Sequence, residues 1–199
     1  MKRRTVCTLS MALYLSACLA WSQAAEIELY FSPNGGAAAA VATEIGTAKK
    51  TIRVMAYSIS EDGITRALIA AQARGIDVRL IVDPNQRDGT YSTANKISIG
   101  GVPTLVDGVH TLMHDKTMVI DDSVTITGSM NFTENGNKHN AENLLVIRDA
   151  VIAARFAADW TKHAQHSNTF TATHSRRFKK LPTPPSPPLV SSPAHTQEP

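Results

Sequence analysis

Residues 114–121 read HDKTMVID, and GSMN follows at 128–131 after a gap of six residues. Side chains two positions apart on a β-strand share a face, so a strand over 111–120 would place His114 beside Lys116. A neutral imidazole can attack phosphorus, and a fixed ammonium group neutralises charge that builds on a phosphate oxygen. This stretch therefore predicts phosphoryl-transfer chemistry.

Two acidic residues complete the neighbourhood of this strand. Asp121 has the opposite parity to the motif pair, so we expect it to brace the local fold rather than to touch a scissile bond. Glu142 precedes the next expected strand and is a candidate to hold one ring nitrogen of His114. A carboxylate in that place fixes the tautomer and supports the imidazolium form, as in a catalytic triad.

The GSMN segment directly follows an expected strand at 124–127. Gly128 permits close backbone approach, while Ser129 and Asn131 offer short neutral groups for phosphate oxygens. An isolated HxK is usually an exposed polar pair, and an isolated GS is usually a turn. The joint pattern HxK-x4-D-x6-GSxN is far more specific than either part, and it favours a phosphodiester site.

Alternating strand and helix patterns predict one α/β domain with a mixed, partly parallel β-sheet flanked by helices. The last expected helix places Ile152, Phe156, Trp160 and His163 on one stripe. The expected strands are 26–32, 51–57, 77–82, 103–106, 111–120, 124–127 and 144–148; the expected helices are 35–50, 61–74, 93–99 and 150–166; the expected loops include 83–91 and 131–140.

The two ends of the chain are set apart by composition. A basic start, an apolar run and a small-x-small pattern at 22–24 predict a bacterial secretory signal peptide over 1–24. A transmembrane anchor is less favoured, because the apolar run is too short to span a membrane. The sequence LSAC at 15–18 offers an alternative, a lipid anchor at Cys18. We expect the folded domain at 25–170 to be exported to the periplasm, with a membrane-anchored lipoprotein as the alternative.

Charge and cysteine content limit the remaining choices. The chain has a formal charge of +3, but residues 25–175 carry 13 basic and 16 acidic residues, a net charge of −3. Bulk charge therefore gives no argument for a nucleic-acid partner. Both cysteines precede the expected cleavage site, which excludes disulfides from the mature chain. The segment 171–199 is basic and then Pro-rich, and we expect it to be a disordered tail.

The motif resembles that of the phospholipase D superfamily, and the closer resemblance is to its small exported bacterial endonucleases. IRVMAYS at 52–58 looks like the family's first central strand, and TGSMNFT at 127–133 and NAEN at 140–143 also match that subgroup. The resemblance runs from about residue 27 to about residue 160. It implies a layered α-β-α fold.

In that family a histidine forms a phosphohistidine, a second histidine protonates the leaving oxygen, and water resolves the intermediate without a metal or other cofactor. Two motifs build one site, whereas this chain contains one. The resemblance thus implies a homodimer in which both subunits contribute His114. Lys116 and Asn131 would bind phosphate, Ser129 would support them, Glu142 would orient His114 and Asp121 would brace the motif.

The function expected from these features is a metal-independent endonuclease of low sequence specificity, acting on DNA, with RNA as a further candidate. One alternative is a phospholipid phosphodiesterase that uses the same residues. Another is a non-catalytic nucleic-acid-binding module, which would not require a nucleophile.

Metal-dependent hydrolysis is the competing chemistry, but the sequence shows neither EF-hand spacing nor an HExxH motif. We therefore expect no metal site. On the last helix, His163 is expected to serve packing or an interface. The other histidines are expected to be solvated: His110, His139, His166, His174 and His195. The aspartates considered as oxygen ligands are Asp83, Asp88, Asp107, Asp115, Asp121 and Asp122.

Overall fold

The computed structural model describes residues 24–86 and 92–172 of the 199-residue chain. The expected signal peptide before residue 24 and most of the expected tail lie outside the described residues. The strands are β1 (Glu26–Ser32), β2 (Thr51–Ala56), β3 (Asp77–Val82), β4 (Thr104–Val106), β5 (Lys116–Ile120), β6 (Val124–Gly128), β7 (Glu142–Arg148) and β8 (Asn168–Thr169). The helices are α2 (Ala37–Thr47), α3 (Asp62–Ala73), a 3-10 turn (Pro84–Gln86), α4 (Thr93–Ile99), α5 (Glu134–Lys138) and α6 (Ala150–His166).

The strands form one mixed sheet in the order β1-β7-β6-β5-β2-β3-β4-β8. The pairs β2–β3 and β3–β4 are parallel, and the other pairs are antiparallel. The parallel pairs are joined through α3 and α4, as crossover connections require, and the antiparallel strands β5, β6 and β7 follow as a meander. The expected mixed, partly parallel sheet is confirmed.

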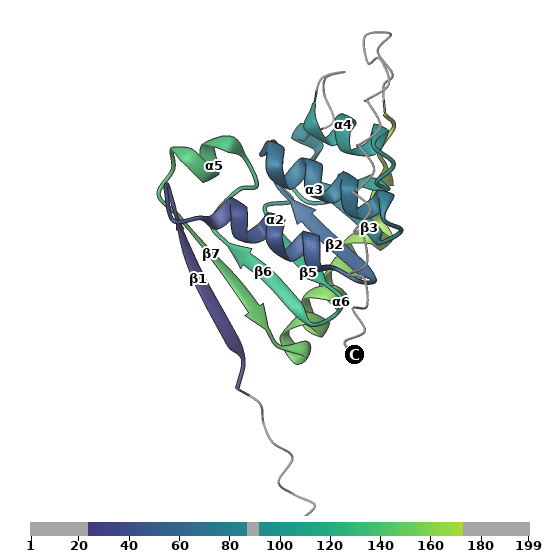
Figure 1. Ribbon diagram of the computed structural model, residues 1–199. Helices are drawn as coiled ribbons and strands as arrows, with labels where there is room; N and C mark the ends of the chain where they lie inside the picture. The colour runs from purple at the N-terminus through teal and green to yellow at the C-terminus, as the bar shows by residue number, and fades with distance from the viewer. Residues whose placement is uncertain (1–23, 87–91, 173–199) are drawn as a thin grey trace, which may run out of the picture.

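Each face of the sheet packs against different helices (Figure 1). Val41 of α2 and Leu68 of α3 are fully buried with Val54 of β2 in the main core. On the opposite face Trp160 of α6 packs with Met55 of β2, and its indole N–H donates to the carbonyl of Val54 at 3.1 Å. Adjacent residues of β2 thus point into two cores, which gives the α-β-α layers.

The stretch expected as one strand over 111–120 begins pairing only at Lys116, so residues 111–115 form a loop that leads into β5. This loop presents His114 to solvent, whereas all five residues of β5 are buried. The predicted strand was therefore too long at its N-terminal end. The alternation of side chains that suggested a strand continues through residues 111–115, but no neighbouring strand pairs with those residues.

The expected loop over 131–140 contains the short helix α5, which the sequence analysis missed. Thr133 caps it by accepting from the N–H of Gly136, and Glu134 forms an i,i+4 ion pair with Lys138. Asn and Gly have low helix propensity, so the local sequence alone favoured a loop. In the described part of the chain, no helix combines the length and apolar character needed to cross a membrane.

Candidate active site

The HxK pair lies where the loop after β4 enters β5. Lys116 pairs with Ala56 of β2. Lys116 is only 8% exposed, while His114 is exposed. The ammonium of Lys116 donates to the carbonyl of His114 at 2.6 Å and lies 3.1 Å from Nδ1 of the same residue. The expected side-by-side arrangement of the two side chains is therefore present, although only one of them belongs to the strand.

Tyr57, which follows β2, forms a wall of the same site. Its ring centroid lies 4.5 Å from that of His114, and the Nζ of Lys116 lies 5.1 Å from the Tyr57 ring centroid. The N–H of Tyr57 also donates to the carbonyl of Asp115, which fixes the loop beside β2. Sequence reasoning missed this residue, although its place directly after a central strand was a usable signal.

Burial lowers the pKa of Lys116, and the nearby carboxylates of Asp115 and Glu142 only partly oppose that shift. An ammonium group only donates hydrogen bonds, so the Nδ1 that faces it acts as an acceptor. A neutral His114 ring in this arrangement carries its proton on Nε2, so Nε2 has no free lone pair with which to attack phosphorus. Attack through Nε2 needs the other tautomer, with Nδ1 donating.

The expected contact between Glu142 and His114 is not present within the described part of this single chain. The carboxylate of Glu142 instead accepts from the Ser129 hydroxyl at 2.6 Å and from the side-chain amide of Asn140 at 3.0 Å. Its charge still acts on Lys116. The physical reason is that Ser129 lies on the neighbouring strand end and reaches Glu142 directly. A bond between Glu142 and His114 stays a prediction for an assembled site.

The end of β6 lies close against β7 at Gly128, the last residue of the strand. Gly128 has φ +152°, and a Cβ there would lie 2.3 Å from the carbonyl oxygen of Asn143. The close approach lets the N–H groups of Ser129 and Met130 both donate to that same carbonyl, at 3.1 and 3.2 Å. The Ser129 hydroxyl accepts from the N–H of Asn143 at 3.0 Å. Ser129 is thus occupied in supporting the segment.

Asn131 has a buried side-chain oxygen with no hydrogen-bond partner among the described residues. This oxygen is enclosed by protein and does not itself face a substrate. Another part of Asn131 lines the polar pocket beside the motif. Its expected role in binding phosphate stays a prediction.

Asp121 lies at the other end of β5 from Lys116. Its carboxylate accepts from the backbone N–H groups of Lys49, Lys50 and Thr51 at 2.7, 2.7 and 2.9 Å. These bonds join the end of β5 to the start of β2. They are contacts of the bracing kind that the sequence analysis expected.

A polar pocket of about 510 Å³ opens beside the motif. Tyr57 and Asn131 line it, so it adjoins the HxK pair. Its remaining lining is also polar: Ser58, Ser60, Thr133, Glu134, Asn135 and Asn140. It can take a polar group more readily than a hydrocarbon chain.

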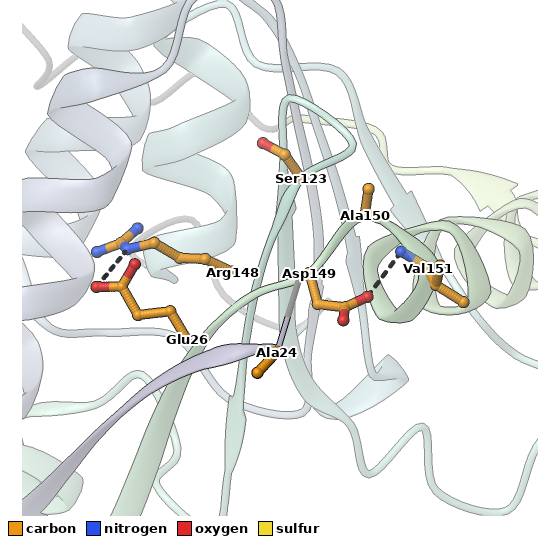
Figure 2. A pocket seen from close by; sticks show the side chains of 7 residues that line it. All are labelled: Ala24, Glu26, Ser123, Arg148, Asp149, Ala150 and Val151. Atoms are coloured by element: carbon orange, nitrogen blue, oxygen red, sulfur yellow. Dashed lines mark hydrogen bonds and ion pairs between the residues drawn. The ribbon is translucent and has the colours of Figure 1, made fainter. Parts of the chain in front are cut away.

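A second pocket, of about 430 Å³, lies at the opposite end of the strands (Figure 2). There Arg148 forms ion pairs with Glu28 and Glu44, at 2.6 and 2.8 Å, and Asp149 caps α6 through the N–H groups of Val151 and Ile152. The charged groups at this pocket are therefore engaged in contacts that join β1, α2, β7 and α6. None of the motif residues lines this pocket.

A cluster of histidines adds contacts that the sequence analysis did not expect. His110, which is exposed as expected, and His166, which is only partly exposed, lie with His163 around the fully buried carboxylate of Asp107. The sequence analysis found no dense group of metal ligands, but these four side chains form one. The cluster escaped notice because more than 50 residues separate its halves and neither half matches a standard motif.

Comparison with known proteins agrees with this geometry. Residues 41–164 match the family described as cardiolipin synthase, PLD-like domain. A phospholipase D of Rickettsia bellii is 36% identical over 135 residues, covering 68% of this chain and 67% of the relative. The crystal structure of Nuc, a phospholipase D family member from Salmonella typhimurium, is 33% identical with a TM-score of 0.70, covering 73% of this chain and 98% of Nuc.

NucT from Helicobacter pylori, at 21% identity, shares the fold with a TM-score of 0.68 over 73% of this chain and 99% of its own. Taken with the matched domain and the HxK geometry, these relationships define the protein's class. The chain belongs to the phospholipase D superfamily and is a phosphodiesterase of that superfamily.

Proposed function

We propose that this phosphodiesterase is a metal-independent endonuclease of low sequence specificity. The observation that carries the proposal is the polar lining of the pocket beside His114 and Lys116. A nucleic-acid backbone presents charged and hydroxylated groups to such a surface, whereas acyl chains need apolar surface. The similarity to Nuc over 98% of that chain supports the same choice.

The proposed reaction has two steps. Nε2 of one His114 attacks phosphorus, the P–O bond to the leaving group breaks, and the leaving oxygen takes a proton from a second, protonated His114. Water then attacks the phosphohistidine, gives its proton to the second histidine and releases a phosphomonoester. Lys116 and Asn131 stabilise the charge on the non-bridging oxygens.

The second His114 is proposed to come from another copy of this chain, because the sequence holds one HxK motif. Two-fold symmetry would place identical residues together on the axis. The loop that carries His114 also exposes apolar side chains: Val109 is 66% exposed and Leu112 is 49% exposed. A partner subunit that completes the site would cover these residues.

The rival substrate is a phospholipid, which the names of the Rickettsia relatives favour. The deciding experiment compares hydrolysis of plasmid DNA with hydrolysis of phosphatidylcholine vesicles by the same preparation. We expect cleaved plasmid and intact lipid. Lipid hydrolysis with uncut DNA would reverse the choice. Loss of the active reaction in His114→Ala would assign either activity to this site.

We also propose that the enzyme acts outside the cytoplasm. This rests on the signal-peptide pattern at residues 1–24. N-terminal sequencing of the protein exported by a bacterial host tests it: a mature start at residue 25 supports a soluble periplasmic enzyme, and a lipid-modified Cys18 supports the anchored alternative.

A further inference from the structure

The histidine–aspartate cluster consists of Asp107, His110, His163 and His166. Asp107 directly follows β4, and its N–H donates to the carbonyl of Val82 at 3.1 Å, which fixes it at the end of the parallel strands. His110 belongs to the loop that leads to His114, and the other two histidines occupy the last turn of α6. The cluster therefore joins the loop carrying the catalytic motif to the end of the last helix.

All three imidazoles converge on a single oxygen. Oδ2 of Asp107 lies 2.7 Å from Nδ1 of His163, 2.9 Å from Nδ1 of His110 and 3.1 Å from Nε2 of His166. The other oxygen, Oδ1, already accepts from the N–H of Val109 at 3.0 Å. A carboxylate oxygen has two in-plane lone pairs, so three ring nitrogens are one more than it accommodates well.

The same distances suit four ligands around one ion. Zinc binds imidazole nitrogen and carboxylate oxygen at about 2.0–2.1 Å in a tetrahedron, which places neighbouring ligand atoms about 3.3 Å apart. The observed nitrogen–oxygen distances need to widen by only a few tenths of an ångström to admit the ion. All four ligand atoms already lie within 4.8 Å of one another.

Asp107 is enclosed by the cluster. Its side chain is fully buried, while the His163 side chain is 15% and the His166 side chain 32% exposed. The three ring nitrogens thus surround one buried carboxylate.

A second carboxylate, that of Asp159, lies next to one of the cluster's histidines. Nε2 of His163, the ring nitrogen that faces away from Asp107, lies 3.7 Å from the carboxylate of Asp159. Metal-binding histidines usually direct the second nitrogen toward such a group, which fixes the ring and raises its basicity. Asp159 also lies near Asp115, the residue between His114 and Lys116.

We propose that Asp107, His110, His163 and His166 bind one Zn²⁺ ion, which clamps the loop before His114 onto the end of α6. Three imidazoles and one carboxylate favour zinc over Mg²⁺ or Ca²⁺, which prefer all-oxygen ligands. With four protein ligands the site is structural, and it adds a stabilising ion to the phosphodiesterase without contributing to the proposed phosphohistidine chemistry.

The test uses the purified full chain, stripped with a chelator and then dialysed. Zinc titrated by calorimetry should bind with one ion per chain and raise the melting temperature, whereas Mg²⁺ should do neither. Co²⁺ should give the intense visible absorption of a tetrahedral site. Asp159→Asn should weaken zinc binding by about 10-fold, as loss of an outer partner does, and His166→Ala should weaken it further.

His110→Ala is a second variant, since His110 is the most exposed ligand and its replacement disturbs packing least. His139→Ala is the matched control, because His139 is exposed and lies outside the cluster. The proposal is overturned if the folded, stripped chain binds no stoichiometric zinc. It is equally overturned if binding survives both ligand variants, which would assign the zinc to other histidines. Neither result depends on nuclease activity.

Discussion

Replacing Asp121 by Asn tests how the end of β5 is tied to the start of β2. The carboxylate accepts three backbone N–H groups, from Lys49, Lys50 and Thr51. Asn keeps the size of the side chain and tolerates the left-handed backbone at this position, where φ is +51°. The substitution therefore removes the charge and one acceptor while leaving the backbone conformation acceptable.

Hydrogen bonds to a charged group contribute about 1.5–3 kcal/mol each when shielded. Two of the three bonds here are exposed, and Asn retains one acceptor oxygen. We therefore expect the free energy of unfolding to fall by about 2–3 kcal/mol in total at neutral pH. For a domain of this size that corresponds to a melting temperature lower by about 4–12 °C.

The effect should depend on pH in a defined direction. Burial raises the pKa of Asp121, but the N–H groups of Thr51, Lys49 and Lys50 lower it more, so its pKa in the folded state lies below the ordinary value. The stabilisation is thus complete above about pH 4, the unfolded pKa, and is lost as pH falls through the folded pKa. The difference between wild type and Asp121→Asn should shrink over that range.

Urea unfolding at pH 7 and at several values below pH 4 measures this difference. Asp122→Asn is the matched control, because Asp122 is adjacent, exposed and in the same backbone region, with φ +53°. It should change stability by less than about 0.5 kcal/mol. Equal stability of the two variants at pH 7, or a difference that does not change in acid, would refute the bracing role of the carboxylate.

Three further predictions concern the site itself. Gly128→Ala should lower the melting temperature and reduce activity at least about 10-fold, because its Cβ would lie 2.3 Å from the carbonyl of Asn143; Gly46→Ala, where the space is open, is the control. Tyr57→Phe should keep most of kcat in steady-state assays because it retains the ring that packs beside His114 and Lys116, whereas Tyr57→Ala should lower kcat strongly; equal kcat for the two variants would contradict a role of the ring in the site. Leu112→Glu should convert the proposed dimer to monomer by light scattering, with loss of activity; an active monomer would exclude a shared site.

The sequence predicted the elements whose pattern is set locally. The helix over 150–166 matches the structure because its apolar stripe forms the packed face, and the strand over 77–82 matches because its apolar, β-branched run is mostly buried. The loop at 111–115 was misjudged because alternation says which side chains could face inward but not whether a neighbouring strand is available. The cap at Thr133 could have indicated α5.

The sequence placed His114 beside Lys116, but the assumed strand was not the reason, because His114 lies in the loop and hydrogen bonds of the Lys116 ammonium hold the two together. The site was not predictable where a side chain can bind residues from several distant segments. The Glu142 carboxylate was expected to bind His114, but within one chain it accepts a hydrogen bond from the Ser129 hydroxyl instead. The cluster around Asp107 depends on how the end of α6 meets the loop after β4, which no local pattern encodes.

Nicking of supercoiled plasmid in excess EDTA, with His114→Ala in parallel, tests the central claim most directly. Circular dichroism of each chelated sample shows that it remains folded, and His139→Ala is the matched histidine control. We expect cleavage by wild type and by His139→Ala, and none by His114→Ala. Cleavage that requires added divalent ions while the chelated protein is folded, or cleavage by His114→Ala at the wild-type rate, would contradict it.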